Sequence, residues 1–339
     1  MMRQQMPVGL PDEPERPAGQ HEHGLRCVPL GAAVAVGIAC VQLLFVFSLG
    51  YPPLHAAPHE VPVGIAGPAP VVAQAEGQLS GQGDAYDLHP YADQAAARAA
   101  IEEREVYGAI VVTPSGPRLL VASAASPVIA GALRAQALRL GGGRPVPVTD
   151  VVPASPADPN GTGSLTTLLP LVLISLALGI AVALVERRRF LRLGWVALAS
   201  ATAGLGVAWI AHAMATFGGS YWGIAAVLGL LVFGIGAVSA GLTQIAAVGR
   251  GLAALLALLM LNIGIPGAGA LVPAELLAQP WRAIGPYLPP GAAVNAMRGA
   301  GFFPGAATGA PLLLLATWAV AGLILVALPT TGRAARARS

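Results

Sequence analysis

Long apolar runs alternate with polar stretches along this chain. A helix of about twenty mostly apolar residues crosses a bilayer core of about 30 Å, and six runs reach that length. They are Val28–Leu49, Leu165–Val185, Leu193–Phe217, Tyr221–Val248, Leu252–Leu271 and Ala310–Leu328. The pattern predicts an α-helical polytopic membrane protein with six transmembrane helices.

The polar, proline-rich stretch between the first two runs alternates strand-like and helix-like segments. The expected strands are Val61–Ala66, Tyr86–Leu88, Gly108–Thr113, Leu119–Ala122 and Val146–Val152, and the expected helices are Pro70–Leu79, Ala92–Glu105 and Pro127–Leu140. This alternation predicts a small α/β domain. Residues 153–161 have the proline-rich composition of a linker, which would let the domain move relative to the helices.

The domain organisation follows from these segments. It is a leader at 1–27, a first transmembrane helix at 28–50, the α/β domain with its linker at 51–163, a five-helix membrane domain at 164–329 and a tail at 330–339. Within the membrane domain, residues 273–309 form a polar insertion with short helices, called the external loop below. No small-residue cleavage site closes the first run, so an uncleaved anchor is favoured over a signal peptide.

Arginine marks one side of the predicted membrane helices. The connector Glu186–Arg192 is strongly basic, Arg250 lies in the next connector on that side, and the tail contains Arg333, Arg336 and Arg338. Because cytoplasmic loops carry the excess of positive charge, we expect both termini in the cytoplasm. The α/β domain and the external loop then lie outside the cell membrane.

Composition agrees with a membrane protein and excludes other classes. The chain is 55% hydrophobic and 10% charged, and its basic residues are all arginine. The net charge of +3 is small and its arginines are scattered, so a nucleic-acid partner is not expected. Richness in alanine, glycine, proline and arginine is typical of a GC-rich, bacterial coding sequence.

Candidate chemistry is sparse. Cys27 and Cys40 are expected to be packing residues rather than a disulfide or metal site. His212 stands alone in the third run, which favours a helix contact over a metal or proton-relay role. A phosphate-binding loop that ends in Gly-Lys-Ser or Gly-Lys-Thr is excluded because the chain has no lysine. We expect no catalytic residues, no metal and no cofactor, and therefore not an enzyme.

Charged residues of the α/β domain are expected to lie on a solvated helix face. They are Arg98, Glu102, Glu103, Arg104 and Glu105. Their spacing on the predicted helix Ala92–Glu105 is typical of exposed charge pairing.

The fifth apolar run contains residues that disfavour a continuous helix. They are Asn262, Gly264, Pro266, Gly267 and Gly269. Irregular backbone at membrane depth is tolerated where it is buried in protein or lines a cavity, as in transporters. These residues are the candidate pathway or hinge, while the alternative is that the glycines only permit close packing, as expected for Gly229, Gly234, Gly236 and Gly241.

Two short amphipathic segments, Glu275–Ile284 and Pro290–Arg298, are expected to dip in from outside as a re-entrant loop. Its candidate residues are Trp281, Pro290, Gly291 and Arg298. Trp281 and Tyr287 suit the membrane interface, where aromatic rings settle at headgroup level.

The order of segments, the interrupted fifth run and the stretch Tyr287–Arg298 followed by Phe302-Phe303 carry a family resemblance. The chain resembles permeases of type-2 ABC exporters, and among them the phage-infection-protein-like (YhgE/Pip) membrane proteins. The resemblance implies a dimeric permease that moves a hydrophobic or amphipathic substrate outward. It also implies a separate cytoplasmic ATPase subunit, which Glu186, Arg187, Arg188 and Arg189 would contact. The proline-rich leader departs from the family's amphipathic coupling helix.

Three functions remain open from the sequence. The first is the permease, embedded in the bilayer as a homodimer and working with a separate ATPase or with another energy source. The second is a membrane-anchored binding or secretion-accessory scaffold whose external domain holds a partner. The third, a membrane enzyme, ranks last because no catalytic constellation is present.

Overall fold

The computed structural model describes residues 21–70, 72–73, 77, 84–114, 116–140, 145–245 and 248–328, with the side chains of 21–30 and 140 left out. Residues 1–20 of the predicted leader, the predicted tail 330–339 and most of the predicted helix Pro70–Leu79 therefore lie outside the described residues. The first helix, α1 (His21–Leu54), carries an apolar segment, Gly31–Leu54, with mainly exposed side chains.

Five helices of the described chain are long and apolar enough to cross a membrane. They are Gly31–Leu54 of α1, α5 (Gly163–Val185), α6 (Arg189–Ala213), α7 (Tyr221–Thr243) and α11 (Gly309–Ala327). The prediction of an apolar, mainly helical membrane protein is confirmed at this level. The described residues thus contain five helices of membrane length, where the sequence predicted six.

The fifth apolar run does not form one helix as far as Leu271. The α-helix α8 (Gly249–Leu259) continues as a π-helix, η1 (Met260–Gly264), and then as a 3-10 turn, η2 (Pro266–Ala268). Proline has no backbone N–H to donate within a helix, and Gly269 has a left-handed φ of 73° that ends the turn. We call residues 249–270 the broken helix.

Helix α7 is the centre of the helical layer and is enclosed along most of its length. Small residues let its neighbours approach closely, as expected for interfaces between membrane helices. A Cβ added to Gly204 of α6 would lie 2.9 Å from the Cα of Gly229, and one added to Gly322 of α11 would lie 2.8 Å from the backbone nitrogen of Val238. Packing therefore explains Gly229 of α7, and also Gly241, where an added Cβ would lie 2.5 Å from the Cβ of Leu325, as the sequence suggested.

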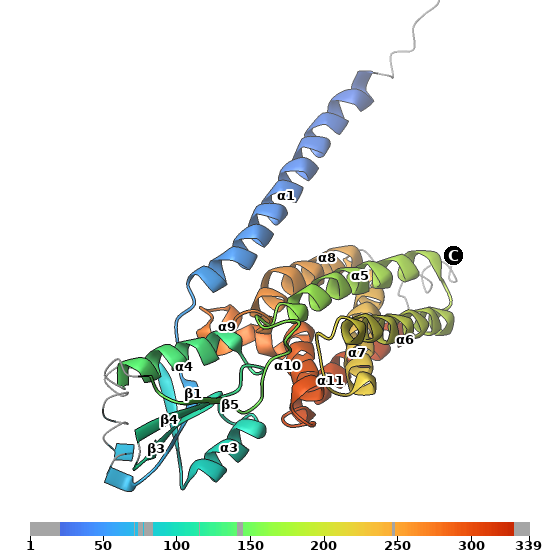
Figure 1. Cartoon of the computed structure of the whole chain (residues 1–339). Coiled ribbons are helices and arrows are strands. Elements are labelled where there is room, and N and C mark those ends of the chain that lie inside the picture. The colour runs from blue at the N-terminus through green and yellow to red at the C-terminus, as the bar shows by residue number, and fades with distance from the viewer. Residues whose placement is uncertain are drawn as a thin grey trace, which may run out of the picture. The chain divides into compact units, whose positions relative to one another are not determined.

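The polar region forms the predicted small α/β domain. Its five strands are β1 (Val61–Ala66), β2 (Tyr86–Tyr91), β3 (Gly108–Thr113), β4 (Gly116–Val121) and β5 (Val148–Asp150), in the order β2-β1-β3-β4-β5. Among the described strands, only the β3–β4 pair is antiparallel. Helix α3 (Gln94–Glu102) and helix α4 (Pro127–Leu140) cover opposite faces of the sheet (Figure 1).

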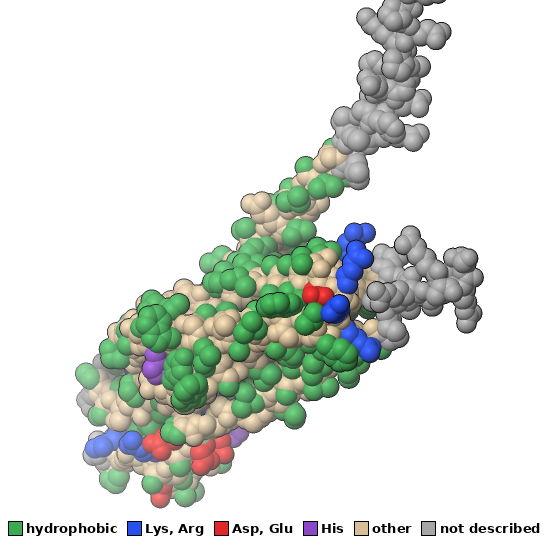
Figure 2. Space-filling view, turned by 90° about the vertical axis from the view of Figure 1, so that its right-hand side faces the viewer, with side chains coloured by type: hydrophobic (Ala, Val, Ile, Leu, Met, Phe, Trp, Pro, Cys, Tyr) green, Lys and Arg blue, Asp and Glu red, His purple; other side chains and the backbone are tan. Residues whose placement is uncertain are grey.

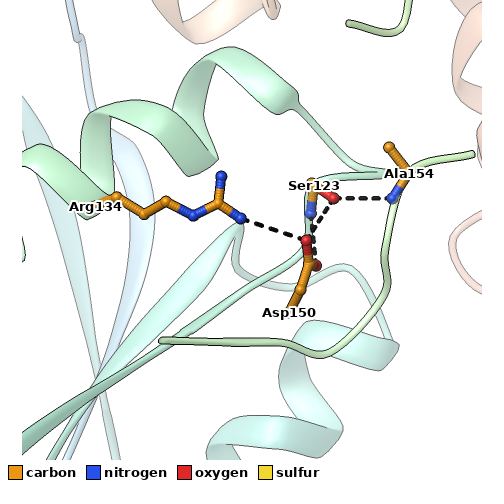
Figure 3. A network of polar contacts seen from close by, with 4 residues as sticks. All are labelled: Ser123, Arg134, Asp150 and Ala154. Atoms are coloured by element: carbon orange, nitrogen blue, oxygen red, sulfur yellow. Dashed lines mark hydrogen bonds and ion pairs between the residues drawn. The ribbon is translucent and has the colours of Figure 1, made fainter. Parts of the chain in front are cut away.

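Strand β5 is shorter than predicted, and its last residue fastens the start of the linker. The Asp150 carboxylate accepts hydrogen bonds from the Ser123 backbone N–H (3.1 Å) and hydroxyl (2.6 Å), and it pairs with Arg134 (Figure 3). The Ser123 oxygen accepts from the Ala154 N–H (2.8 Å). Farther on, the Ser155 hydroxyl donates to the Ala215 carbonyl (2.5 Å). The linker is thus tied to both the domain and the end of α6, which differs from the free linker predicted.

Candidate functional site where the external loop meets the broken helix and the domain

The external loop folds into short elements that protein surrounds. They are η3 (Ala274–Leu276), α9 (Trp281–Ile284), η4 (Gly285–Tyr287) and α10 (Pro289–Phe302). Nearly every residue of α10 is buried, because α7, α11 and the broken helix pack around it. The sequence predicted that two short amphipathic segments dip in from outside as a re-entrant loop. The structure encloses the second of them, α10, in protein, and its re-entrant position stays a prediction.

Side chains of the external loop satisfy backbone groups that the break exposes. The indole N–H of Trp281 donates to the carbonyl of Asn262 (2.7 Å). The Arg298 guanidinium donates to the carbonyls of Gly269 (2.7 Å) and Ala270 (3.1 Å). Unpaired backbone groups are costly in an apolar environment, so these two side chains stabilise the irregular conformation. Trp281 is 7% exposed, so its ring packs against protein, and its position at headgroup level stays a prediction.

Glycines allow close contacts between the broken helix and the external loop, and also within the loop. A Cβ added to Gly267 would lie 2.8 Å from the Cα of Gly285, and one added to Gly291 would collide with the Gly285 carbonyl oxygen. A Cβ on Gly264 would lie 3.1 Å from the ring of Pro290. The structure thus brings the predicted pathway residues together with the predicted re-entrant residues. At Gly264 and Gly267 close packing is sufficient to explain the glycine, while their role as hinge or pathway stays a prediction.

Asn262 and His212 each keep one polar atom without a partner among the described residues. The Asn262 amide nitrogen donates to the Leu258 carbonyl (2.9 Å), but its buried side-chain oxygen has no hydrogen bond. Nδ1 of His212 is also buried and unpaired, and its ring packs edge-on against Tyr221 at 5.8 Å between centroids. In the part of the chain that the structure describes, no three His, Cys, Asp or Glu side chains are grouped to hold a metal.

Two apolar side chains of the external loop complete the cores on both faces of the sheet. Leu276 packs with the residues between the sheet and α4. Phe303, which is 1% exposed, packs with the residues between the sheet and α3. The α/β domain and the external loop therefore share their hydrophobic cores, and the loop holds the domain on both sides.

Hydrogen bonds and an ion pair also join the α/β domain to the external loop near Leu276 and Phe303. The Arg104 guanidinium donates to the carbonyl (2.9 Å) and the side-chain oxygen (3.2 Å) of Asn295 and lies over the Phe303 ring at 5.3 Å. The Tyr107 hydroxyl donates to the Glu275 carboxylate (3.0 Å). Arg282 also pairs with Glu60. These bonds join positions up to 222 residues apart in the sequence.

The position of Arg104 differs from the prediction that the charged residues 98–105 share one solvated helix face. Arg98 and Glu102 do form an exposed pair on α3 (2.9 Å). Arg104 instead lies beyond the end of α3 with a left-handed φ of 64°, which turns its side chain away from the helix surface toward Asn295. Sequence spacing placed all five charges on one helix, so the turn at Arg104 could not be seen.

Burial sets the protonation of this cluster. Desolvation, and next the nearby Glu275 carboxylate, raise the pKa of Tyr107 far above its ordinary value. Desolvation lowers the pKa of Arg104 and lowers that of Arg298 to about 10. At neutral pH Tyr107 is therefore a neutral donor and Arg298 remains a cation.

Two cavities border the external loop. One of about 260 Å³ is polar and is lined by charged and polar side chains that include Arg104, Glu105, Tyr107, Glu275 and Asn295. The other, of about 640 Å³, is mostly apolar. It is lined by the start of α7, the end of α10, residues 303–305 and the start of α11. Neither cavity was predicted, because their walls come from segments far apart in the sequence.

The predicted coupling residues lie at the opposite end of the helices. Glu186 accepts from the backbone N–H of Arg188 (2.7 Å), and Arg189 donates to the carbonyl of Ala327 at the end of α11 (3.3 Å). Helix α11 begins at the external loop and is about 28 Å long at 1.5 Å per residue. Arg187, Arg188 and Arg189 are exposed, and Figure 2 shows basic side chains gathered at one end of the apolar flank and mixed charges at the other.

Comparison of the chain with family models, with curated proteins and with solved structures finds no match. The geometry of the external loop, the broken helix and the two cavities is therefore the basis for assigning a function.

Proposed function

We propose that this chain is a membrane permease subunit that moves a hydrophobic or amphipathic substrate outward. It works as a homodimer in the plasma membrane of a bacterium and takes its energy from a separate cytoplasmic ATPase. The observation that carries the proposal is the apolar cavity of about 640 Å³ at the ends of α7 and α11 that adjoin the external loop. Its volume lies in the range of small-molecule sites.

Six membrane crossings are part of this proposal. The helical part of the broken helix, Gly249–Gly264, is about 24 Å long and alone is shorter than the bilayer core. It begins beside Leu242 and Thr243 at the end of α7 and leads into the segment held by Trp281 and Arg298. The irregular residues that follow are buried in protein, where such backbone is tolerated, and they complete the sixth crossing.

The arginines support the orientation and the ATPase contact. Arg187, Arg188 and Arg189 form an exposed basic end, and the α/β domain contacts the external loop at the other end of α11. With positive charge inside, both termini face the cytoplasm and the α/β domain faces outward. An ATPase subunit would then reach the α5–α6 connection, Glu186 to Arg189.

Deletion of the gene and crosslinking test this proposal together. Loss of the chain is expected to lower resistance to lipophilic compounds, and crosslinkers placed at Arg187 to Arg189 are expected to capture an ATPase. The proposal is wrong if these positions never reach an ATPase and resistance is unchanged.

The scaffold hypothesis remains the second candidate, because the external loop inserts Leu276 and Phe303 into the two cores of the α/β domain. Such fastening suits a rigid platform for a partner. Recovery of a specific external partner from a strain whose resistance does not depend on the chain would favour the scaffold over the permease.

A further inference from the structure

The polar and the apolar cavity share a wall. Asn295 lines the polar cavity and the next residue, Ala296, lines the apolar one. At the start of α11, Ala307 and Pro311 face the polar cavity, and Thr308 and Leu312 face the apolar cavity. The contact of Arg104 with the Phe303 ring joins the two linings directly. A ligand with one polar and one apolar end could therefore place each end in a matching cavity across this wall.

The charge of the polar cavity indicates which headgroup fits. Its lining holds one guanidinium, Arg104, against two carboxylates, Glu105 and Glu275, so one negative charge is unbalanced. Arg104 is already engaged with both oxygens of Asn295 and with Phe303.

The carboxylates have acceptor capacity to spare. Among the described residues, Glu105 and Glu275 form no ion pair, and each accepts a side-chain hydrogen bond only from a tyrosine hydroxyl. The guanidinium of Arg298 donates to carbonyls of the broken helix and does not line this cavity. An ammonium group has three donors and no acceptor, which matches this lining better than a sulfate or phosphate would.

We propose that the two cavities form one site for a cationic amphiphile, with its ammonium head beside Glu105 and Glu275 and its alkyl chain against the α7, α10 and α11 lining. This inference rests on the proposed function, because it names the chemical class of the exported substrate. Arg104 lines the polar cavity and Phe303 lines the apolar one, and the contact between these two side chains marks the boundary between the head and the chain of the ligand.

Photolabelling in lipid nanodiscs tests the site independently of transport. The probe is a dodecylammonium ion with a diazirine at the end of its chain, and labelled peptides are mapped by mass spectrometry. Label is expected in residues 218–227 and 300–312, with unlabelled dodecylammonium competing at least about fivefold better than dodecyl sulfate or dodecanol, as a charge contact at a partly exposed site allows. Equal competition by dodecyl sulfate, or label confined to lipid-facing positions of α6, would overturn the proposal.

Matched variants test the contact of the ammonium head and the contact of the alkyl chain separately. Glu105→Gln is expected to weaken competition by dodecylammonium about threefold, and Glu103→Gln, an exposed carboxylate outside the cavity lining, should leave it unchanged. Ala226→Phe fills the apolar cavity and should remove the label, while Ala197→Phe on an exposed position of α6 should not. If both cavity variants label like the wild type, the site is wrong.

Export assays distinguish failure of the site from failure of the proposed function. If Glu105→Gln and Ala226→Phe do not change the export of lipophilic compounds, the permease proposal holds and the proposed site is wrong. If the chain is labelled specifically but exports no lipophilic compound, the binding site is supported and the permease proposal is wrong.

Discussion

Helices α7 and α10 are both enclosed by protein, but different forces enclose them. Helix α7 is a continuous apolar helix whose glycines admit its neighbours, and its backbone is satisfied within the helix. Helix α10 contains Asn295 and Arg298, and besides α7 and α11 it contacts irregular segments, where carbonyls accept hydrogen bonds from the Arg298 side chain. Apolar length and small residues therefore build the centre of the helical layer. The external loop depends on specific side-chain contacts.

The largest effect is expected at the anchor that joins α10 to the domain. Phe303→Ala should lower the free energy of unfolding by about 4 kcal/mol, because a buried phenylalanine is lost from the α3-side core and a cavity remains. Thermal unfolding in detergent micelles measures this change. Phe190→Ala, at a phenylalanine that is 76% exposed at the start of α6, is the matched control and should have little effect there. Equal losses in both variants would show that Phe303 is not an anchor.

Removal of the arginine that supports the broken helix should come next. Arg298→Met keeps the length of the side chain but leaves the carbonyls of Gly269 and Ala270 without their donor, at a cost of about 3 kcal/mol. Hydrogen exchange of residues 265–272 should increase with the same substitution. Arg118→Met, at an exposed arginine of β4, should leave both measurements unchanged. Unchanged exchange in Arg298→Met would contradict the supporting role.

A smaller effect is expected where two elements of the external loop, η4 and α10, touch through glycine. Gly291→Ala should destabilise by about 2 kcal/mol, because the added Cβ collides with the Gly285 carbonyl and the segments must shift apart. Gly206→Ala in α6 meets no atom within 4 Å and should be neutral or slightly stabilising. The difference in melting temperature between these two variants checks the prediction, and equal values would contradict it.

The smallest effect is a pH dependence at the polar contact between Tyr107 and Glu275. Because burial and Glu275 raise the pKa of Tyr107 in the folded state, its contribution to stability is present below about pH 10, where the unfolded tyrosine ionises, and is lost as pH rises further. Above pH 10 the wild type should lose stability faster than Tyr107→Phe, by up to about 1.4 kcal/mol per pH unit. Parallel curves for the two proteins would show that Tyr107 is not buried as a neutral group.

Hydropathy and residue pattern predicted much of the fold because these features are local. The apolar runs located α1, α5, α6, α7 and α11, and alternation of strands and helices located the sheet with α3 and α4. Asn262, Pro266 and Gly269 correctly marked where a continuous helix could not continue. In the external loop, Trp281 and Arg298 were selected as notable, but their partners were not predictable. Arg104, Tyr107 and Phe303 were missed as site residues, since no local signal distinguishes them from ordinary surface or interface residues.

The sequence by itself therefore determined which segments are apolar enough for a bilayer, which segment folds as an α/β domain, and where a helix must break. Only the tertiary structure decided that the external loop completes both cores of that domain, that Arg298 and Trp281 satisfy the broken helix, and that two cavities of opposite character share a wall. The physical reason is the range of the interactions. Helix length and backbone preference act over a few residues, whereas Arg104 and Asn295 are 191 positions apart and meet only when the whole chain has folded.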